Sequence, residues 1–242
     1  DRETGDCTVQ PHFDYPHAYL ADLPSKLTAT GVGRGYRADE AAERTPPPRK
    51  EVQLRAPLFE QGEKKLTPAE IGTAHHLFMQ FCDFDAACAQ NGVENELNRL
   101  AEKKILSTEQ AHAVDKRKIE RFFASDLYKT FMAENKVRRE FKFSVLVPAQ
   151  AYFPVAADAP EENVLLQGVI DCLIETRDGF VILDFKTDRI KKGGAVERAE
   201  QYRPQLAAYA RAVHEIYGRP VRACVLYFFH TGDTEWVSLD ED

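Results

Sequence analysis

The fold is decided by the stretch Gly168-Val-Ile-Asp171-Cys-Leu-Ile-Glu-Thr-Arg-Asp-Gly179-Phe-Val-Ile-Leu-Asp184-Phe-Lys186. Residues 164–175 are apolar and rich in β-branched side chains, residues 177–179 read Arg-Asp-Gly, and residues 180–185 are apolar again. Two apolar runs joined by a short glycine-containing turn predict a β-hairpin.

Three charged side chains stand on this otherwise apolar hairpin. Each strand offers one carboxylate, Asp171 or Asp184, and Lys186 follows Asp184 by two residues, on the same face of the strand. Burying such charges is costly unless they pair with each other or hold a metal. Because Mg²⁺ prefers oxygen ligands and can activate water, the trio indicates a metal-dependent phosphodiesterase. The competing interpretation is structural: aspartates that end a strand or cap a turn, and an edge-strand lysine.

The composition is that of an ordinary globular protein. The chain has 242 residues, 43% hydrophobic and 29% charged, enough for one sizeable domain or a domain plus an extension. No apolar run reaches the length of a membrane span and no signal peptide is visible, so we expect a cytoplasmic protein with no membrane partner. The first residue is Asp rather than Met, and we therefore expect a piece of a longer protein.

The net charge of −7 argues against a general nucleic-acid coat. A nuclease, however, needs only a basic rim around an acidic metal site. Two local clusters could form such a rim, or could be a solvated surface. They are Lys186, Arg189, Lys191 and Lys192, and Lys136, Arg138, Arg139 and Lys142.

The five cysteines indicate reduced thiols. Their number is odd and no C-x-x-C pair occurs, so we expect neither a zinc site nor an iron–sulfur cluster. Cys172 and Cys224 lie in apolar runs and are expected in the core.

The chain divides into an extension and a domain. Residues 1–50 look irregular, with a linker signature at Thr45-Pro-Pro-Pro48, and the segment Leu23–Thr30 could pack as an apolar strip on the main body. Residues 51–242 form the predicted domain, with a helical part at 67–135 and a core at 136–239.

Periodicity predicts helices first and strands afterwards. Helices are expected at 68–91, capped by Thr67, at 94–104, at 108–123, capped by Ser107, and at 126–135. There follow a strand at 137–147 with Phe141, Phe143, Val145 and Val147 on one face, the hairpin, a helix at 204–217, and strands at 221–229 and 234–239. This order predicts an α/β fold with a mixed β-sheet flanked by helices and an N-terminal helical subdomain.

Further positions could contribute to a site. Gln205 and Tyr209 share one helical face; Gln205 could orient the lysine or a metal-bound water, while Tyr209 alone reads as a core aromatic. His75 and His76 lie in the first predicted helix, where one is expected to be semi-buried and the other turned away. Glu140 could be an accessory acid or a solvated side chain.

Three motifs resemble the PD-(D/E)XK nuclease superfamily in its RecB-like branch: Gly168-Val-Ile-Asp171, Ile182-Leu-Asp184-Phe-Lys186-Thr-Asp-Arg189 and Gln205-Leu-Ala-Ala-Tyr209. The runs Gly72-Thr-Ala-His-His76-Leu-Phe-Met-Gln80, Arg139-Glu-Phe141 and Leu23–Thr30 extend the resemblance to the C-terminal nuclease domains of AddA-type subunits of AddAB helicase–nucleases. The resemblance covers most of the chain and implies a restriction-endonuclease-like core.

The resemblance also implies roles for these residues. His76, Asp171 and Asp184 would be metal ligands together with the Phe185 carbonyl oxygen, and His75 would be the variable neighbour. Lys186 would be the catalytic lysine, supported by the pair Gln205 and Tyr209. Glu140 would be an accessory acid near the metal.

The implied activity is Mg²⁺-dependent cleavage of single-stranded DNA unwound by a helicase, in recombinational repair of double-strand breaks, with Mn²⁺ able to substitute. No G-x-x-x-x-G-K-[ST] motif occurs, so no ATP site is expected here, and the helicase would lie upstream in the same polypeptide. The implied partner is an AddB-like protein with an iron–sulfur cluster of its own. The alternative is a catalytically silent module of the same fold that binds DNA or a partner; the intact Asp171, Asp184 and Lys186 favour the nuclease.

Overall fold

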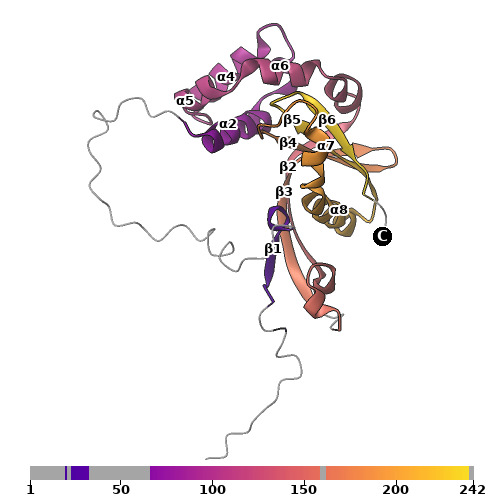
Figure 1. Cartoon of the computed structure of the whole chain (residues 1–242). Coiled ribbons are helices and arrows are strands. Elements are labelled where there is room, and N and C mark those ends of the chain that lie inside the picture. Colours follow the sequence, from indigo (N-terminus) through magenta and orange to yellow (C-terminus); the bar gives the residue numbers. More distant parts are fainter. Residues whose placement is uncertain (1–19, 21–22, 33–65, 159–161, 240–242) are drawn as a thin grey trace, which may run out of the picture.

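The structure is a computed structural model that describes residues 20, 23–32, 66–158 and 162–239 (Figure 1). Within these residues, six strands form a mixed sheet in the order β1-β3-β4-β5-β6, and β2 also pairs with β3. The strands are β1 (Lys26–Thr28), β2 (Lys136–Pro148), β3 (Asn163–Thr176), β4 (Gly179–Lys186), β5 (Val221–Phe228) and β6 (Asp233–Val237). The predicted α/β class with a mixed sheet is confirmed.

The predicted hairpin is confirmed as β3 and β4. They pair antiparallel over residues 172–176 and 179–183. Gly179 closes the turn with a φ of 151°, and a Cβ at this position would lie 2.3 Å from the Pro220 carbonyl oxygen. The turn therefore needs glycine.

A gap in the pairing of β3 creates space at Asp171. β2 runs along one edge of β3 for almost its whole length. The other edge pairs with β1 at residues 165–167 and with β4 at residues 172–176, so residues 168–171 have neither partner. Figure 1 shows β2 and β3 extending past the rest of the sheet, with β1 beside them. β1 comes from the Leu23–Thr30 segment, which the sequence predicts only as an apolar strip.

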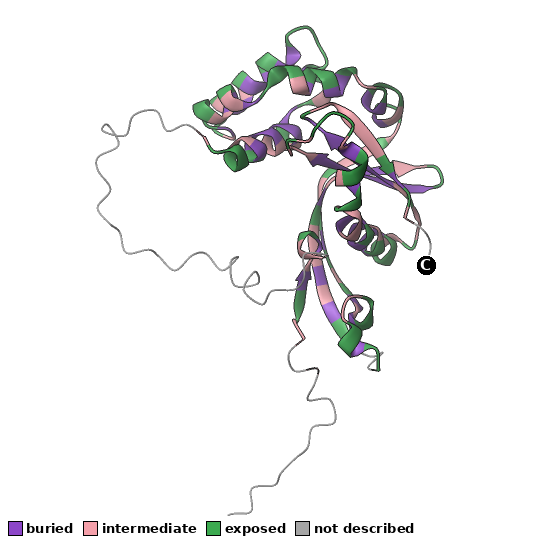
Figure 2. Cartoon of the chain, in the orientation of Figure 1, coloured by how far each residue is buried: buried purple, intermediate pink, exposed green. Residues whose placement is uncertain are grey.

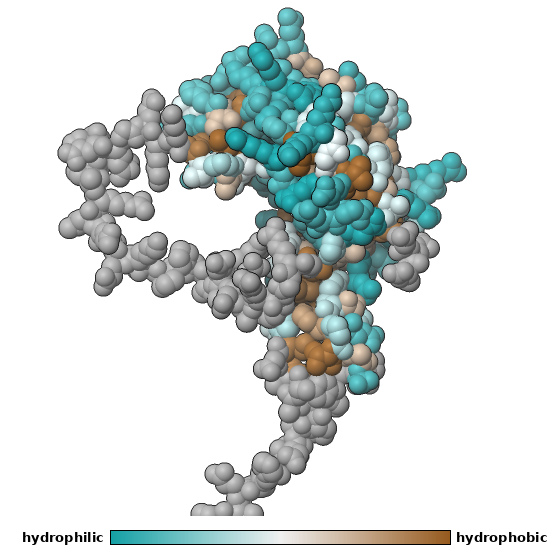
Figure 3. Space-filling model, viewed as in Figure 1, coloured by the Kyte–Doolittle hydropathy of each residue, from teal (hydrophilic) through white to brown (hydrophobic). Residues whose placement is uncertain are grey.

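Helices cover both faces of the sheet. On one face lie α2 (Pro68–Phe81), α3 (Phe84–Ala87), α4 (Gly92–Glu102), α5 (Thr108–Ala113), α6 (Lys116–Ala124) and a π-helical segment at Leu127–Met132. On the other face lie α7 (Ala195–Glu200) and α8 (Arg203–Tyr217). The space-filling view shows that the outer surface around α4 and α6 is largely hydrophilic (Figure 3). The predicted helical subdomain is therefore a layer on the sheet.

The helix predicted at 68–91 is too long. It ends at Phe81, because Cys82 is extended and the Asp83 side chain accepts the N–H groups of Asp85 and Ala86, which begins α3. The start of α2 is as predicted: Thr67 and Glu70 form a capping box.

The helix predicted at 108–123 is also broken. Its Ser107 cap is present, but Val114 is extended, and the Asp115 N–H next to the break donates to His75 Nε2 at 3.2 Å. A backbone group released by the break thus finds a tertiary partner. The helix predicted at 126–135 shortens to the π-helical Leu127–Met132.

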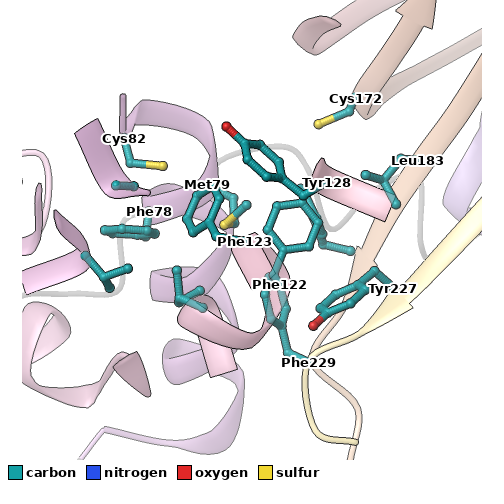
Figure 4. Packing of buried hydrophobic residues seen from close by; sticks show 14 of the residues in the cluster. Phe78, Met79, Cys82, Phe122, Phe123, Tyr128, Cys172, Leu183, Tyr227 and Phe229 are labelled. Carbon is teal, nitrogen blue, oxygen red and sulfur yellow. The ribbon is translucent and has the colours of Figure 1, made fainter. Parts of the chain in front are cut away.

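The sheet separates two hydrophobic cores, and Figure 2 shows buried residues on the strands and on the helices that cover them. The core beneath α2–α6 is rich in aromatic rings, among them Phe78, Phe122, Tyr227 and Phe229, which Figure 4 shows packed together. The core beneath α8 contains mainly aliphatic side chains from β3, β5 and the helix. Along β4, Val181, Leu183 and Phe185 face the first core while Phe180 and Ile182 face the second, so Asp184 and Lys186 belong by alternation to the α8 side.

Both long strands change face at one position. On β3, Ile170 belongs to the α8 core and Cys172 to the aromatic core, although residues two apart normally share a face. On β2, Val137 packs on the aromatic core and Phe143 on the α8 core. The change occurs at Glu140, which has a φ of 51°, and at Asp171, the two residues that the register skips between the pairs Arg139–Cys172 and Phe141–Ile170. The two acids therefore mark a twist in the strand pair.

The remaining predictions have mixed outcomes. The strands expected at 137–147, 221–229 and 234–239 are present as β2, β5 and β6, and Cys172 and Cys224 are buried as expected. The proline-rich linker at 45–48 lies outside the described residues, and the domain boundaries stay a prediction. Among the described helices, none has the length and apolar character needed to cross a membrane.

Candidate functional site

Asp171 and Asp184 meet where β3 and β4 separate. The Asp171 Oδ2 atom accepts the main-chain N–H of Phe185 at 2.7 Å. Phe185 lies just beyond the residues of β4 that pair with β3, so the carboxylate takes the place of a strand partner. The two aspartates predicted from the hairpin are thus held on adjacent strands at one fork.

Asp184 and Lys186 form a buried ion pair. Lys186 Nζ lies 2.7 Å from Asp184 Oδ2, and their side chains are only 12% and 6% exposed. Burial raises the pKa of the Asp184 carboxyl, the Lys186 ammonium opposes this, and the charge of Asp171 adds to the increase. The predicted same-face placement of the two residues is confirmed.

Gln205 connects this pair to α8. Its Oε1 accepts from Lys186 Nζ at 3.3 Å, and its Nε2 donates to the Tyr209 hydroxyl at 2.7 Å and approaches Asp184 Oδ1 at 3.5 Å. Tyr209 itself is buried. The structure therefore places Gln205 between the lysine, the carboxylate and a core tyrosine.

His76 reaches the site from the opposite helical layer. Its Nδ1 lies 3.4 Å from Asp171 Oδ2, and its side chain is 35% exposed. Burial alone would lower the pKa of His76, but Asp171 and then Asp184 raise it above its ordinary value. The helix docks closely because Gly72 has no side chain: a Cβ there would lie 2.8 Å from Thr187 Oγ1.

His75 points away from the carboxylates. Its Nδ1 donates to the Ile71 carbonyl at 2.9 Å, and its Nε2 accepts the Asp115 N–H, so both ring nitrogens are used in packing. Burial lowers the pKa of His75, which favours the neutral ring that this arrangement needs. The helical pattern predicts one semi-buried histidine and one turned away; in the structure His76 is semi-exposed at the site and His75 is buried in packing.

Glu140 faces the same space from β2. A small recess is lined by Glu140, His76, Asp171 and Phe185, together with two residues of α2. Burial, and then the charge of Asp171, raise the pKa of the Glu140 carboxyl. Glu140 is therefore close to the site, and the prediction of a merely solvated side chain does not fit its half-buried position.

The residues fit a hard divalent cation. The region contains three carboxylates, Asp171, Asp184 and Glu140, and one ammonium. Burial, together with the charge of Asp171, raises the pKa values of Asp184 and Glu140. Carboxylate oxygens are suitable ligands for Mg²⁺ or Mn²⁺, whereas the His76 imidazole is a ligand type that softer divalent metals prefer. In the part of the chain that the structure describes, no three His, Cys, Asp or Glu side chains already converge to ligand distance. The carboxylates of Asp184 and Asp171 are instead engaged by Lys186 and by the Phe185 N–H.

Two residues of the second basic cluster, expected as either a rim or a solvated surface, have structural roles. Arg139 donates to the carbonyls of Met79 and Cys82, at the end of α2, and its guanidinium lies over the Phe84 ring. Arg138 donates to the Tyr217 hydroxyl and pairs with Glu175. In the first cluster, Arg189, Lys191 and Lys192 are exposed.

Sequence reasoning missed one group beside the lysine. The Tyr202 ring lies under the ammonium, with its centroid 3.7 Å from Lys186 Nζ. The Tyr202 hydroxyl donates to Asp188, which also accepts from Arg198 Nε at 3.2 Å. The sequence contained one hint of this group. Arg198 and Tyr202 are four residues apart and Gln205 follows three residues later, a spacing that would place all three on one side of a helix.

Comparisons with known proteins identify the family of the chain. The sequence profile described as the PD-(D/E)XK nuclease superfamily matches residues 49–238. Relatives from Moorella thermoacetica and Desulforamulus reducens, each named as the A-type subunit of the ATP-dependent helicase/nuclease, are 40% and 38% identical over 223 residues, which cover 91% of this chain. The protein of the same name from Desulforudis audaxviator is 35% identical over 232 residues, or 92% of this chain.

These relatives are far longer than the chain, which spans 16% of the Moorella protein and 18% of the other two. A solved structure titled "Crystal structure of SSO0001" aligns with a TM-score of 0.33 at 12% identity, covering 75% of this chain and 71% of that chain. A likeness this weak says nothing about the site.

Proposed function

Because the chain belongs to the PD-(D/E)XK nuclease superfamily, we propose that it is the metal-dependent deoxyribonuclease module of an AddA-like helicase–nuclease. Its proposed substrate is single-stranded DNA released by a helicase during repair of double-strand breaks. The observation that carries the proposal is the contact set around Lys186, which joins Asp184, Gln205 and, through the strand fork, Asp171. The relatives' names, which combine helicase and nuclease, support the assignment.

His76, Asp171 and Asp184 would hold the cation, with the Phe185 carbonyl oxygen as a further ligand and Glu140 beside them. A bound Mg²⁺ or Mn²⁺ lowers the pKa of water and stabilises negative charge on a phosphate. The chain's own residues would do the rest. Lys186 would hold a positive charge where the scissile phosphate enters, and Gln205, buttressed by Tyr209, would keep its ammonium oriented.

The proposed partners follow from the relatives. The chain corresponds to less than a fifth of their length, so helicase segments of the same polypeptide would deliver the strand. Because the relatives are named as one type of subunit, a second protein would complete the assembly, and an AddB-like protein is our proposal for it. We propose that this nuclease activity takes place in the bacterial cytoplasm.

The test is digestion of labelled single-stranded DNA with Mg²⁺, compared with duplex DNA and RNA. We expect digestion of single-stranded DNA, loss with EDTA, and loss of about 100-fold or more in Asp184→Asn and Lys186→Ala, since each removes a charge at the reacting phosphate. Asp178→Asn is the matched control, an exposed aspartate in the turn of the same hairpin. Digestion that survives both site substitutions would contradict the assignment.

Titration calorimetry with Mn²⁺ separates the nuclease from the silent module. We expect heat of binding in the wild type and in Asp178→Asn, and none in Asp171→Asn. A wild type that neither binds the metal nor cuts DNA would overturn the proposal in favour of a non-catalytic module.

A further inference from the structure

We propose that Tyr202 is a positioning residue for Lys186: its ring face, held by Asp188 and Arg198, fixes the lysine ammonium against Asp184. The inference rests on the proposed function, because it takes Lys186 as the lysine that acts on the phosphate. The contact between ring and ammonium is independent of that assumption.

The ammonium is enclosed on three sides. An ammonium group has three N–H donors. Asp184 Oδ2 accepts one at 2.7 Å and Gln205 Oε1 another at 3.3 Å. The third direction is covered by the Tyr202 ring, whose centroid lies 3.7 Å from Nζ, well inside the range of a cation–π interaction. Because the lysine stem is long and flexible, this third contact limits the positions that the charge can occupy.

The backbone of Tyr202 is fixed between two helices. Its N–H donates to the Ala199 carbonyl at 2.9 Å, at the end of α7, and its carbonyl accepts from the Leu206 N–H at 3.0 Å, in the first turn of α8. Tyr202 is the residue immediately before α8. The ring therefore projects from a rigid junction.

The hydroxyl adds a second hold on the ring, besides the backbone junction. The hydroxyl donates to Asp188 Oδ2, and Arg198 contributes to both partners, through Nε to Asp188 at 3.2 Å and through Nη2 to the Tyr202 oxygen at 3.3 Å. Asp188, Arg198 and Tyr202 thus form a closed hydrogen-bonded triangle beside the lysine.

The triangle also keeps Asp188 from competing for the lysine. Burial would raise the pKa of the Asp188 carboxyl, but hydrogen bonds from Tyr202 and Arg198 lower it, so Asp188 is charged at neutral pH. Burial and the neighbouring carboxylate raise the pKa of Tyr202 to about 12, so the phenol stays neutral and can donate. With its oxygen engaged by these two donors, Asp188 leaves Lys186 to Asp184.

Two substitutions separate the ring from the hydroxyl. Tyr202→Phe keeps the ring face and removes the bond to Asp188, whereas Tyr202→Leu removes the ring. Tyr217→Leu is the matched control: this tyrosine lies at the other end of α8, with its ring 5.4 Å from the Arg138 guanidinium. If the ring face positions the Lys186 ammonium, Tyr202→Phe should keep this positioning and Tyr202→Leu should lose it.

The first measurement does not need activity. In protein with ¹³C-labelled lysine ε-carbons, the Lys186 ε-protons, assigned by their loss in Lys186→Met, should be shifted upfield by the Tyr202 ring. We expect the shift to persist in Tyr202→Phe and Tyr217→Leu and to vanish in Tyr202→Leu. A Lys186 signal that is the same in wild type and Tyr202→Leu would overturn the proposal.

The second measurement is single-stranded DNA cleavage. We expect Tyr202→Leu to lower kcat by about 3- to 30-fold with little change in KM, the range that one cation–π contact supports. Tyr202→Phe should stay within about threefold of wild type, and thermal unfolding should show that each variant is folded. Equal kcat values in wild type and folded Tyr202→Leu would contradict the positioning role. An inactive wild type with an intact ring-current shift would instead locate the failure in the proposed function.

Discussion

Glu140 has a backbone conformation that residues with a side chain rarely adopt. Its φ of 51° lies in the left-handed region, in the middle of a long strand. For a non-glycine residue this costs about 1–2 kcal/mol. This conformation changes the face that β2 presents to each core, and it brings Glu140 toward Asp171 and His76. Strain at this position is consistent with a site that sets three acidic groups close together.

We predict that Glu140→Gly is more stable than Glu140→Ala by about 1 kcal/mol, because both lose the carboxylate but only alanine keeps the Cβ that clashes at positive φ. In an ordinary strand position the order would be reversed. Urea unfolding of the two variants measures the difference. An alanine variant as stable as the glycine variant would mean that this strand does not hold a left-handed residue.

At the scale of elements, the docking of α2 on the end of β4 brings His76 to the hairpin. The contact is between Gly72 and Thr187, where an added Cβ would lie 2.8 Å from Thr187 Oγ1. Gly72 precedes His76 by one helical turn, so both lie on the face that meets the sheet. A displacement of the helix at Gly72 is therefore transmitted to the histidine.

We predict that Gly72→Ala lowers both metal affinity and cleavage, although alanine normally favours a helix interior by about 1 kcal/mol. The added methyl group must push α2 away from β4 or force the threonine side chain to rotate. Thr187→Ala in the same chain should restore part of the loss, because it removes the opposing oxygen. Calorimetry with Mn²⁺ on the single and double variants is the test, and a Gly72→Ala variant with wild-type affinity would contradict the close approach.

Glu96 joins α4 to the break between α2 and α3. Its buried carboxylate accepts the Asp83 N–H at 2.6 Å and two hydrogen bonds from Arg99, which also donates to the Phe81 carbonyl. The hydrogen bonds from Arg99 lower the pKa of Glu96, burial opposes them, and the Asp83 N–H lowers it further. The charged carboxylate is therefore the form that stabilises this junction.

We predict that Glu96→Gln costs about 1.5–3 kcal/mol at pH 7, the usual value for hydrogen bonds to a charged group. Since the folded pKa is lowered, the contribution of Glu96 is present above the unfolded pKa of about 4.3 and is lost as pH falls below it through the folded pKa. The difference in free energy of unfolding between wild type and variant, measured with urea, should shrink as the pH falls below about 5. A difference that stays constant as the pH falls would mean that the carboxylate charge is not involved.

Apolar runs next to glycine-containing turns were sufficient to predict β4 and β5, because residues 180–185 and 221–229 each follow such a turn, whereas β1 was expected only as an apolar strip. The helix breaks at Cys82 and Val114 were not predictable, since neither has a proline or glycine nearby. They depend on partners distant in sequence, Arg139 for the end of α2 and His75 for the Asp115 N–H. Tyr202 escaped detection for the same reason, because its role depends on where Lys186 lies in space.

At the scale of the whole molecule, the site lies at the boundary between two cores. Asp184 and Lys186 face α8, whereas Phe185 between them faces the aromatic core. The N–H of Phe185 holds Asp171, and its ring packs edge-on to Phe122 of α6 at a centroid distance of 5.2 Å. The helical layer therefore fixes the backbone on which the carboxylates are arranged.

Phe122 is the residue through which that support can be tested, because it is fully buried and its ring also meets Tyr227 at a centroid distance of 4.9 Å (Figure 4). We predict that Phe122→Ala lowers the free energy of unfolding by about 3–5 kcal/mol, the cost of a large cavity in a packed core. Phe81→Ala, at a phenylalanine of α2 that is 43% exposed, should cost less than about 1 kcal/mol. The gentler Phe122→Leu should leave the chain folded but loosen Phe185, so its metal affinity should fall while that of Phe81→Ala stays at the wild-type value. If Phe122→Leu binds Mn²⁺ as tightly as wild type, the site does not depend on the aromatic core, and the fork of β3 and β4 alone must hold Asp171 in place.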